Sequence, residues 1–386
     1  MRVAVFGASG FVGATLVERL RRRRDLEVRA LIHSAGNAWR LARWGMPLGF
    51  TDLLSRGSIA EVLKGCTHVV NCTRGSEDVM LIGLKNLLSE ARAQKIQRFI
   101  HLSSVAVYGD PPRPESENED AEPHPARGSY GEIKLKQDTL ISHAHRNGLN
   151  CIVLCPPNIS GAYSSFVCNV LQDIRIGSFA LIEGGRSPLN IVDVANLCHA
   201  IELALVAESA DGRRIFVTDG DHITWRDFAE ALGPLAERTL PLAELPRDRV
   251  GQPPQANSPR SSSFARAIKH LVSSDVRQAL RQDPLLAKVE AGARKLVTCL
   301  PRGVEERIRD AVVGPIKIAK RGEPDPHSSR YNTQQLRVVV HRTGRAKTVL
   351  RYQPEISFLE SMEAFRRWYT MSHGFGTEGW RLSRWL

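Results

Sequence analysis

Short apolar runs alternate with segments of helical spacing through the first half of this chain. The apolar runs have the length of buried strands and lie at 3–6, 28–32, 68–72, 98–103 and 151–154. The intervening segments repeat their apolar positions at helical intervals and lie at 11–22, 59–63, 80–94 and 130–147. Buried strands that alternate with helices are typical of a doubly wound parallel sheet, so the pattern predicts an α/β fold.

A glycine turn follows the first apolar run directly. The residues Gly7-Ala8-Ser9-Gly10-Phe11-Val12-Gly13 separate the strand at 3–6 from the helix at 11–22. A dinucleotide pyrophosphate binds backbone N–H groups at close approach, and a helix N-terminus supplies such groups together with a favourable dipole. Side chains at the three glycine positions would block that approach. The placement between strand and helix therefore favours a dinucleotide site of Rossmann type over a plain tight turn.

The pattern changes after Pro156-Pro157. Residues 189–205 predict a strand and a helix that return to the main sheet, and residues 214–218 predict one further strand. We therefore predict a dinucleotide-binding Rossmann domain at 1–157, completed by about 189–220. The remaining segments form a smaller, discontinuous substrate lobe, at 158–188 and 221–386.

Three other segments stand apart from this alternation. The loop 110–128 is rich in Pro and Glu, and we expect it to be a flexible rim of the active-site cleft. Residues 251–263 are dense in Pro, Gln, Ser and Asn and open a basic insert that extends to about residue 341. Residues 349–369 predict a short turn followed by a helix.

The net charge of +12 is concentrated in the insert. Between Arg260 and Arg321 there are 14 Lys or Arg residues against 6 Asp or Glu, and the apolar positions from Phe264 to Val272 predict an amphipathic helix. We favour a cap on the substrate lobe with a solvated basic face. A surface that contacts anionic lipid is the alternative. Nucleic-acid binding is not expected, because aromatic residues do not interleave with the charges.

Composition places the chain among globular proteins of the cytoplasm. Hydrophobic residues make up 42% of the 386 residues, and no stretch approaches the roughly 18 consecutive apolar residues of a membrane span. The first strand begins at once after Met1, so we expect no signal segment and a cytoplasmic location, with contact to a membrane surface as the alternative. The seven cysteines are scattered in apolar runs, as expected of reduced thiols, and show no metal-binding pairing.

Tyr130 and Lys134 are four residues apart on a predicted helix, so their side chains share a face. A tyrosine works as an acid or base near pH 7 only if its pKa falls by about three units, or roughly 4 kcal/mol. An ammonium group about 4 Å away supplies approximately that free energy at an effective dielectric of about 20. Ser104, which follows the strand at 98–103, would then polarise the oxygen that gains or loses the proton. An isolated Tyr-x-x-x-Lys is otherwise a solvated helix pair.

These motifs together resemble the extended short-chain dehydrogenase/reductase family, which includes nucleotide-sugar epimerases, dehydratases and reductases. GASGFVG at 7–13 is similar to the family's GxxGxxG fingerprint, SSVAVYG at 103–109 to its SSxxVYG segment, and YGEIK at 130–134 to its YxxxK. RSPLNIVDVANL at 186–197 resembles the late segment in which a strand leads into a helix. The resemblance covers roughly 1–245 and 345–370.

The resemblance implies roles for individual residues. Tyr130 is the catalytic acid/base, Lys134 binds the nicotinamide ribose and lowers the tyrosine pKa, and Ser104 is the third catalytic member. The glycine turn binds the cofactor through Gly7, Ser9, Gly10, Phe11, Val12 and Gly13. Asp52 matches the family's adenine-contacting carboxylate. Asn158 is a candidate for the substrate nucleotide, and Arg186 for a substrate phosphate or, equally, for a surface charge.

Two departures from the family pattern bear on the expected cofactor and on the expected reaction. The second strand ends in Leu31-Ile32-His33-Ser34, without the acidic residue that holds the ribose 2′-hydroxyl of NAD. Arg40 and Arg43 follow soon after and suit a 2′-phosphate, so NADP is favoured over NAD, with Arg40 as a cofactor residue. Val105-Ala106 stands where dehydratases carry Asp-Glu, so dehydration is not expected.

The sequence thus predicts an NAD(P)-dependent oxidoreductase or epimerase that acts on a nucleotide-linked sugar by hydride transfer. A reductase or dehydrogenase of a steroid-like or lipid-linked alcohol or ketone, working at a membrane surface, is the first alternative. A non-catalytic cofactor sensor is the second, and the presence of Ser104, Tyr130 and Lys134 weighs against it. The expected partners are a small-molecule substrate and a second copy of the chain, paired through the helices at 80–94 and 130–147. No metal is expected.

Overall fold

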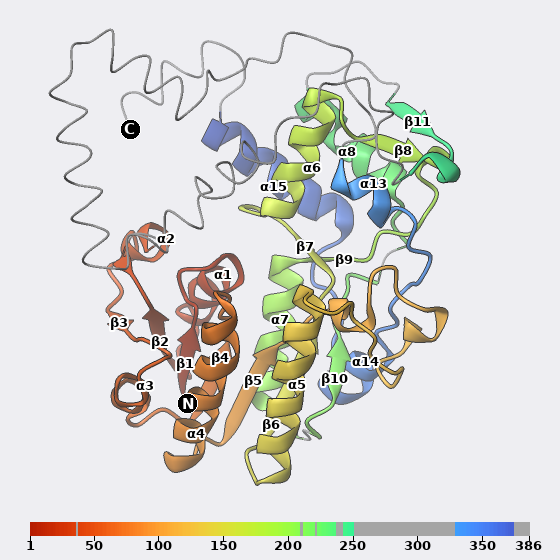
Figure 1. The fold of residues 1–386 in the computed structure, drawn as a ribbon. Helices are drawn as coiled ribbons and strands as arrows, with labels where there is room; N and C mark the ends of the chain where they lie inside the picture. Colours follow the sequence, from red (N-terminus) through yellow and green to blue (C-terminus); the bar gives the residue numbers. More distant parts are fainter. Residues whose placement is uncertain (36–37, 209–210, 221, 237–241, 251–328, 374–386) are drawn as a thin grey trace, which may run out of the picture. The chain divides into compact units, whose positions relative to one another are not determined.

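The computed structural model describes residues 1–35, 38–208, 211–220, 222–236, 242–250 and 329–373. At the centre of this part lies a parallel sheet of seven strands in the order β10-β6-β5-β4-β1-β2-β3 (Figure 1). The strands are β1 (Arg2–Phe6), β2 (Glu27–Ile32), β3 (Leu48–Phe50), β4 (His68–Asn71), β5 (Arg98–Leu102), β6 (Cys151–Cys155) and β10 (Arg214–Phe216). The order reverses direction between β1 and β4, as in a doubly wound Rossmann sheet. The predicted fold class is confirmed.

Helices cover both faces of this sheet. One face packs against α1 (Phe11–Leu20), α2 (Trp39–Ala42), α7 (Val194–Val206) and α14 (Gly344–Leu350). The other face packs against α3 (Arg56–Leu63), α4 (Leu84–Ala93) and α5 (Tyr130–Arg146). Within β1, Val3 and Val5 face the first layer, while Ala4 and Phe6 face the second. Burial on both faces explains why β1 reads as an unbroken apolar run.

A second cluster of buried residues lies outside the main sheet. It joins α6 (Ser165–Ile176), α8 (Trp225–Ala236), α13 (Arg330–Gln334) and α15 (Phe358–His373). Two small parallel sheets accompany these helices: β7 (Asn158–Ser160) with β9 (Ile191–Asp193), and β8 (Ala180–Ile182) with β11 (Ala243–Leu245). In this cluster Phe166 and Phe228 stack on one another, and Trp225 contacts both rings edge-on. The division into domains that we drew from the sequence stays a prediction.

Several short helical segments connect these helices and strands. A π-helical turn, Val79–Gly83, leads into α4, and single turns lie at Val105–Tyr108, Pro114–Glu117, Glu183–Gly185 and Arg247–Arg249.

One expected strand has a different partner. The strand predicted at the start of 189–205 forms as β9, but it pairs with β7 rather than with the main sheet. The helix that follows it, α7, does pack on the main sheet. The residue pattern identifies a buried strand, but a three-residue strand carries too little pattern to select its partner.

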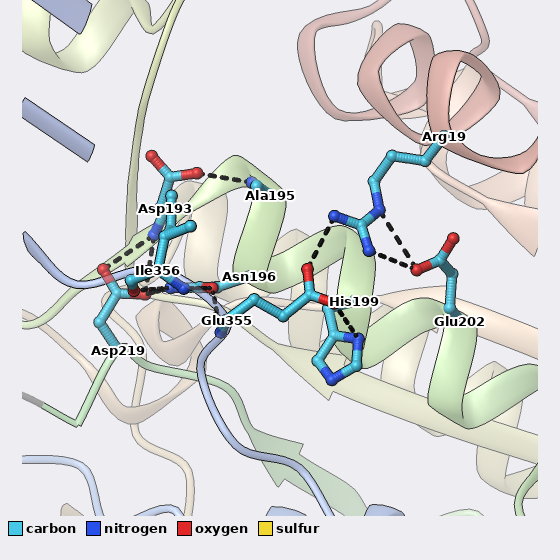
Figure 2. Close-up of polar contacts among 9 residues, drawn as sticks. All are labelled: Arg19, Asp193, Ala195, Asn196, His199, Glu202, Asp219, Glu355 and Ile356. Atoms are coloured by element: carbon cyan, nitrogen blue, oxygen red, sulfur yellow. Dashed lines mark hydrogen bonds and ion pairs between the residues drawn. The ribbon is translucent and has the colours of Figure 1, made fainter. Parts of the chain in front are cut away.

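Asn196, on α7, ties the end of the second cluster to the main sheet (Figure 2). Its amide oxygen accepts hydrogen bonds from the backbone N–H groups of Glu355 and Ile356, at 2.8 and 3.1 Å. Its amide nitrogen donates to Asp219 at 2.7 Å. Arg19, on α1, bridges Glu202 and Glu355 at 2.6 and 2.8 Å. These bonds fix the segment before α15 against the dinucleotide-binding half.

The loop 110–128 is anchored, contrary to the expectation of a free rim. His341 donates from Nδ1 to the carbonyl oxygen of Ser116 at 2.8 Å, and Tyr108 donates to the carbonyl oxygen of Glu119 at 2.6 Å. Arg337 forms a two-bonded ion pair with Asp110. Two of the residues that hold the loop, Arg337 and His341, come from the end of the predicted insert, and their distance in the sequence hid these contacts. The amphipathic helix expected at 264–272 lies outside the described residues.

Candidate functional site

The glycine turn is as tight as the motif requires. Gly7 has a φ of +76°, and a Cβ placed on it would lie 2.9 Å from the backbone carbonyl of Cys72 at the end of β4. A Cβ on Gly13 would lie 2.2 Å from the Gly7 carbonyl oxygen. Both distances are too short for any side chain, so the two glycines let α1 begin directly against the ends of β1 and β4.

The start of α1 offers free donors. Gly10 occupies the N-cap position and has no side chain to cap the helix. The first N–H groups of an α-helix have no acceptor within the helix, and here they belong to Phe11, Val12 and Gly13. Ser9, half-buried, precedes them in the turn. This arrangement, a narrow turn that opens onto uncapped N–H groups, fits the pyrophosphate of a dinucleotide.

The residues expected near the adenosine end lie at the carboxyl edge of the sheet. Asp52 follows β3 and accepts a hydrogen bond from the Leu54 backbone at 2.9 Å. Arg40 is buried, bonds Glu18 at 2.8 Å, and stacks over Tyr163 with 4.1 Å from its Cζ to the ring centroid. Arg43, more exposed, bonds the same Glu18. An anion that binds Arg40 would compete with the Glu18 carboxylate.

Gly131 brings the two catalytic motifs together. Ser104 follows β5, caps the turn Val105–Tyr108 and accepts a hydrogen bond from the Ala106 backbone at 3.2 Å. Tyr130 is the first residue of α5. A Cβ on Gly131 would lie 2.1 Å from the Ala106 carbonyl oxygen, so α5 reaches this turn only because residue 131 is glycine. The sequence analysis missed this role, although the glycine next to the tyrosine was visible.

Lys134 is buried one helical turn after Tyr130. Its Nζ donates to the Leu102 carbonyl oxygen at 2.8 Å and lies 5.8 Å from the Tyr130 ring centroid. Burial lowers the pKa of the Lys134 ammonium to about 8, and the Asp138 carboxylate opposes this drop. The lysine is therefore held by the last carbonyl of β5 at the floor of the site.

The pKa of Tyr130 differs from the expectation. Burial raises the pKa of its hydroxyl above the ordinary value, and the guanidinium of Arg74 is the cation that opposes the rise. The Arg74 Cζ lies 5.0 Å from the Tyr130 ring centroid. The lowering of this pKa by Lys134, which the family resemblance implies, stays a prediction; the Lys134 ammonium bonds the Leu102 carbonyl oxygen. Sequence spacing placed the lysine on the correct face but could not give its direction.

The two candidate substrate residues belong to different elements: Asn158 lies on β7, and Arg186 follows the turn Glu183–Gly185. Asn158, on β7, donates to Gln334 at 3.4 Å. Arg186 is exposed and lines an open hollow together with Glu183, Arg226 and Glu244. The structure thus leaves Arg186 available to a ligand, while Asn158 already has a partner from α13.

The described residues contain no cluster of three or more His, Cys, Asp or Glu side chains placed to hold a metal ion. Of the helices in the described ranges, none combines the length and the apolar composition needed to cross a membrane.

The sheet, the glycine turn and the uncapped α1 define a dinucleotide-binding enzyme of Rossmann type. The chain belongs to the NAD dependent epimerase/dehydratase family, whose model matches residues 3–217. It is therefore an oxidoreductase of the extended short-chain type, as its motifs predicted.

Named relatives align with about three fifths of this chain or more. A 4-hydroxy-2-methyl-3-oxo-4-farnesyl-3,4-dihydroquinoline-1-oxide ketoreductase from Stigmatella aurantiaca is 30% identical over 60% of this chain and 72% of its own length. Sterol demethylase protein B from Methylococcus capsulatus is 28% identical over 66% and 78%. A solved UDP-glucuronic acid 4-epimerase from Bacillus cereus, in complex with NAD, matches 97% of this chain and all of its own with a TM-score of 0.63 at 15% identity. That last likeness concerns the fold alone.

Proposed function

We propose that this enzyme interconverts a ketone and a secondary alcohol on a hydrophobic ring substrate, with NAD(P) as hydride carrier and Tyr130 as acid/base. The observation that carries the proposal is the close packing of α5 on the turn after Ser104, made possible by Gly131. This packing gathers a hydroxyl donor, a phenol and a buried ammonium at the carboxyl edge of the sheet, beside the glycine turn.

In the reduction, Tyr130 donates its proton to the substrate carbonyl oxygen. Ser104 donates a hydrogen bond to the same oxygen, which gains negative charge as the carbon is reduced. NAD(P), when bound, would supply the hydride to that carbon. Gly7, Gly10 and Gly13 would hold its pyrophosphate, and Lys134 would bind its ribose. In the oxidation, Tyr130 accepts the hydroxyl proton instead.

The names of the relatives support a hydrophobic ring substrate. One denotes a ketoreductase of a farnesylated dihydroquinoline oxide and the other a sterol demethylase component. Both match this chain at a higher identity than the UDP-glucose 4-epimerase of Vibrio cholerae, which is 22% identical over 63% of the chain. We therefore rank a hydrophobic ring substrate above a nucleotide sugar, whereas the sequence alone favoured the nucleotide sugar.

Action on a nucleotide sugar is the second candidate. The observation in its favour is Arg186, which is exposed beside a hollow and free for a phosphate. Asn158 weighs less, because its amide already bonds Gln334.

We also propose NADP as the preferred cofactor. Ile32 ends β2 without an acidic residue after it, and two arginines, Arg40 and Arg43, lie on the segment that follows. A homodimer through α4 and α5, a cytoplasmic location and a membrane contact of the basic insert stay predictions.

A substrate panel tests the proposed function. Purified full-length protein is incubated with NADPH or NADH and a steroid ketone, a prenylated quinoline ketone, UDP-glucose or dTDP-glucose. We expect oxidation of NADPH with a ring ketone at a rate at least about tenfold above that with NADH. Interconversion of UDP-glucose and UDP-galactose without net NADPH oxidation would favour the second candidate and contradict the first.

A further inference from the structure

Arg74 places a positive charge against Tyr130, the proposed acid/base. The sequence motifs did not indicate this arginine. It lies three residues past the end of β4, at the same edge of the sheet as Ser104. Its guanidinium stacks against the Tyr130 ring, with 5.0 Å from Cζ to the ring centroid. Among the residues that the structure describes, no carboxylate forms an ion pair with Arg74. Its positive charge is therefore not neutralised where it meets the tyrosine.

Lys134 alone is a poor source of positive charge at alkaline pH. Its ammonium bonds the Leu102 carbonyl oxygen, and burial lowers its pKa to about 8. It therefore loses its proton in the pH range below the ordinary pKa of a tyrosine, which is about 10. A guanidinium keeps its charge throughout this range. Arg74 is thus the cation whose charge persists while Tyr130 ionises.

We propose that Arg74 is a positioning residue that stabilises the ionised form of Tyr130. The inference rests on the proposed role of Tyr130 as acid/base. It adds the cation that stabilises the phenolate form of this residue. The charged groups around Tyr130 are Arg74, from the loop after β4, and Lys134 and Asp138, from α5 itself. The turn after Ser104 contributes a hydroxyl and no charge. Asp138 opposes ionisation, so Arg74 acts against both that carboxylate and burial.

Fluorine NMR of protein grown with 3-fluorotyrosine measures this effect without substrate or cofactor. The chain has 6 tyrosines, and the Tyr130→Phe variant identifies the resonance of residue 130. The fluorinated phenol is more acidic than tyrosine, which moves the titration toward pH values at which proteins stay folded. We expect Arg74→Gln to raise the titration midpoint of residue 130 by about one pH unit. Arg74→Lys retains a charge and is expected to restore at least half of the shift.

Arg146→Gln is the matched control, because Arg146 is exposed at the far end of the same helix. It changes the net charge equally and is expected to move the midpoint by less than roughly 0.2 units, since salt screens distant surface charges. An Arg74→Gln midpoint equal to that of the control overturns the proposal, and so does a lower one. The result is separate from the proposed function, which fails if Tyr130→Phe retains turnover, whatever Arg74 does to the titration.

Discussion

At the scale of single residues, Gly131 and Lys134 decide what Tyr130 can do. The missing side chain of Gly131 lets the first turn of α5 contact Ala106, and the Tyr130 ring has two cations near it, Arg74 at 5.0 Å and Lys134 at 5.8 Å from the ring centroid. Both effects depend on distances of a few ångströms that a four-residue spacing does not specify. The identity of the catalytic candidates was predictable from the sequence, whereas their electrostatics were not.

Substituting Gly131 with alanine is expected to separate the two catalytic motifs. The added Cβ would lie 2.1 Å from the Ala106 carbonyl oxygen, so α5 must move away from the turn. We expect a loss of about 1–3 kcal/mol in the free energy of unfolding and at least about a hundredfold in kcat/KM. Denaturant unfolding and turnover assays measure the two effects.

Gly57→Ala serves as the control for this substitution. A Cβ at Gly57 meets no atom within 4 Å, and the residue lies in α3. It is expected to leave turnover unchanged and to stabilise the helix slightly, by about 0.5–1 kcal/mol. Equal turnover in the Gly131 and Gly57 variants would show that the contact with Ala106 does not position Tyr130.

At the scale of elements, residues at the end of the predicted basic insert hold the loop at 110–128. His341 is 4% exposed, bonds the Ser116 carbonyl, and packs against Phe216 with ring centroids 4.7 Å apart. Burial lowers the pKa of His341 to about 4, well below its ordinary value of 6.5. The native protein therefore keeps this imidazole neutral at pH values where the unfolded chain binds a proton.

This difference makes stability depend on pH in a known direction. Between about pH 4 and 6.5 the unfolded state binds more protons at residue 341 than the native state, so the contribution of His341 to stability rises with pH across this window. Above pH 6.5 this contribution to the free energy of unfolding reaches its full value of about 3 kcal/mol. We expect the difference in unfolding free energy between pH 7 and pH 5 to shrink in His341→Gln. An unchanged difference would show that His341 is not the group responsible.

The elements themselves divide into those that local pattern determines and those that it does not. β1, β4, β5 and β6 each present apolar residues to two helical layers, and their prediction as buried strands is confirmed. β9 has three residues, and its pairing with β7 depends on contacts outside its own sequence. The loop 110–128 looked free because its partners, Arg337 and His341, are more than 200 positions away.

At the scale of the whole molecule, polar bonds, some partly buried and some exposed, join the segment before α15 to helices that pack on the main sheet. Asn196 and Arg19 bind the segment at 355–356 from α7 and α1 (Figure 2). The family model covers only residues 3–217, so the sequence resemblance alone says little of how the later chain returns. The sequence accordingly predicted least about the second cluster, which we expect to select the substrate.

The central claim is that Tyr130 transfers the proton while the glycine turn holds the cofactor. The measurement that tests it most directly compares Tyr130→Phe with the wild type in two assays: turnover on the best substrate of the panel, and NADPH binding by fluorescence titration. We predict a turnover lower by about 10²–10⁴-fold and a cofactor Kd within about twofold of the wild-type value. Turnover within a few-fold of the wild type, with the same cofactor affinity, would contradict the account.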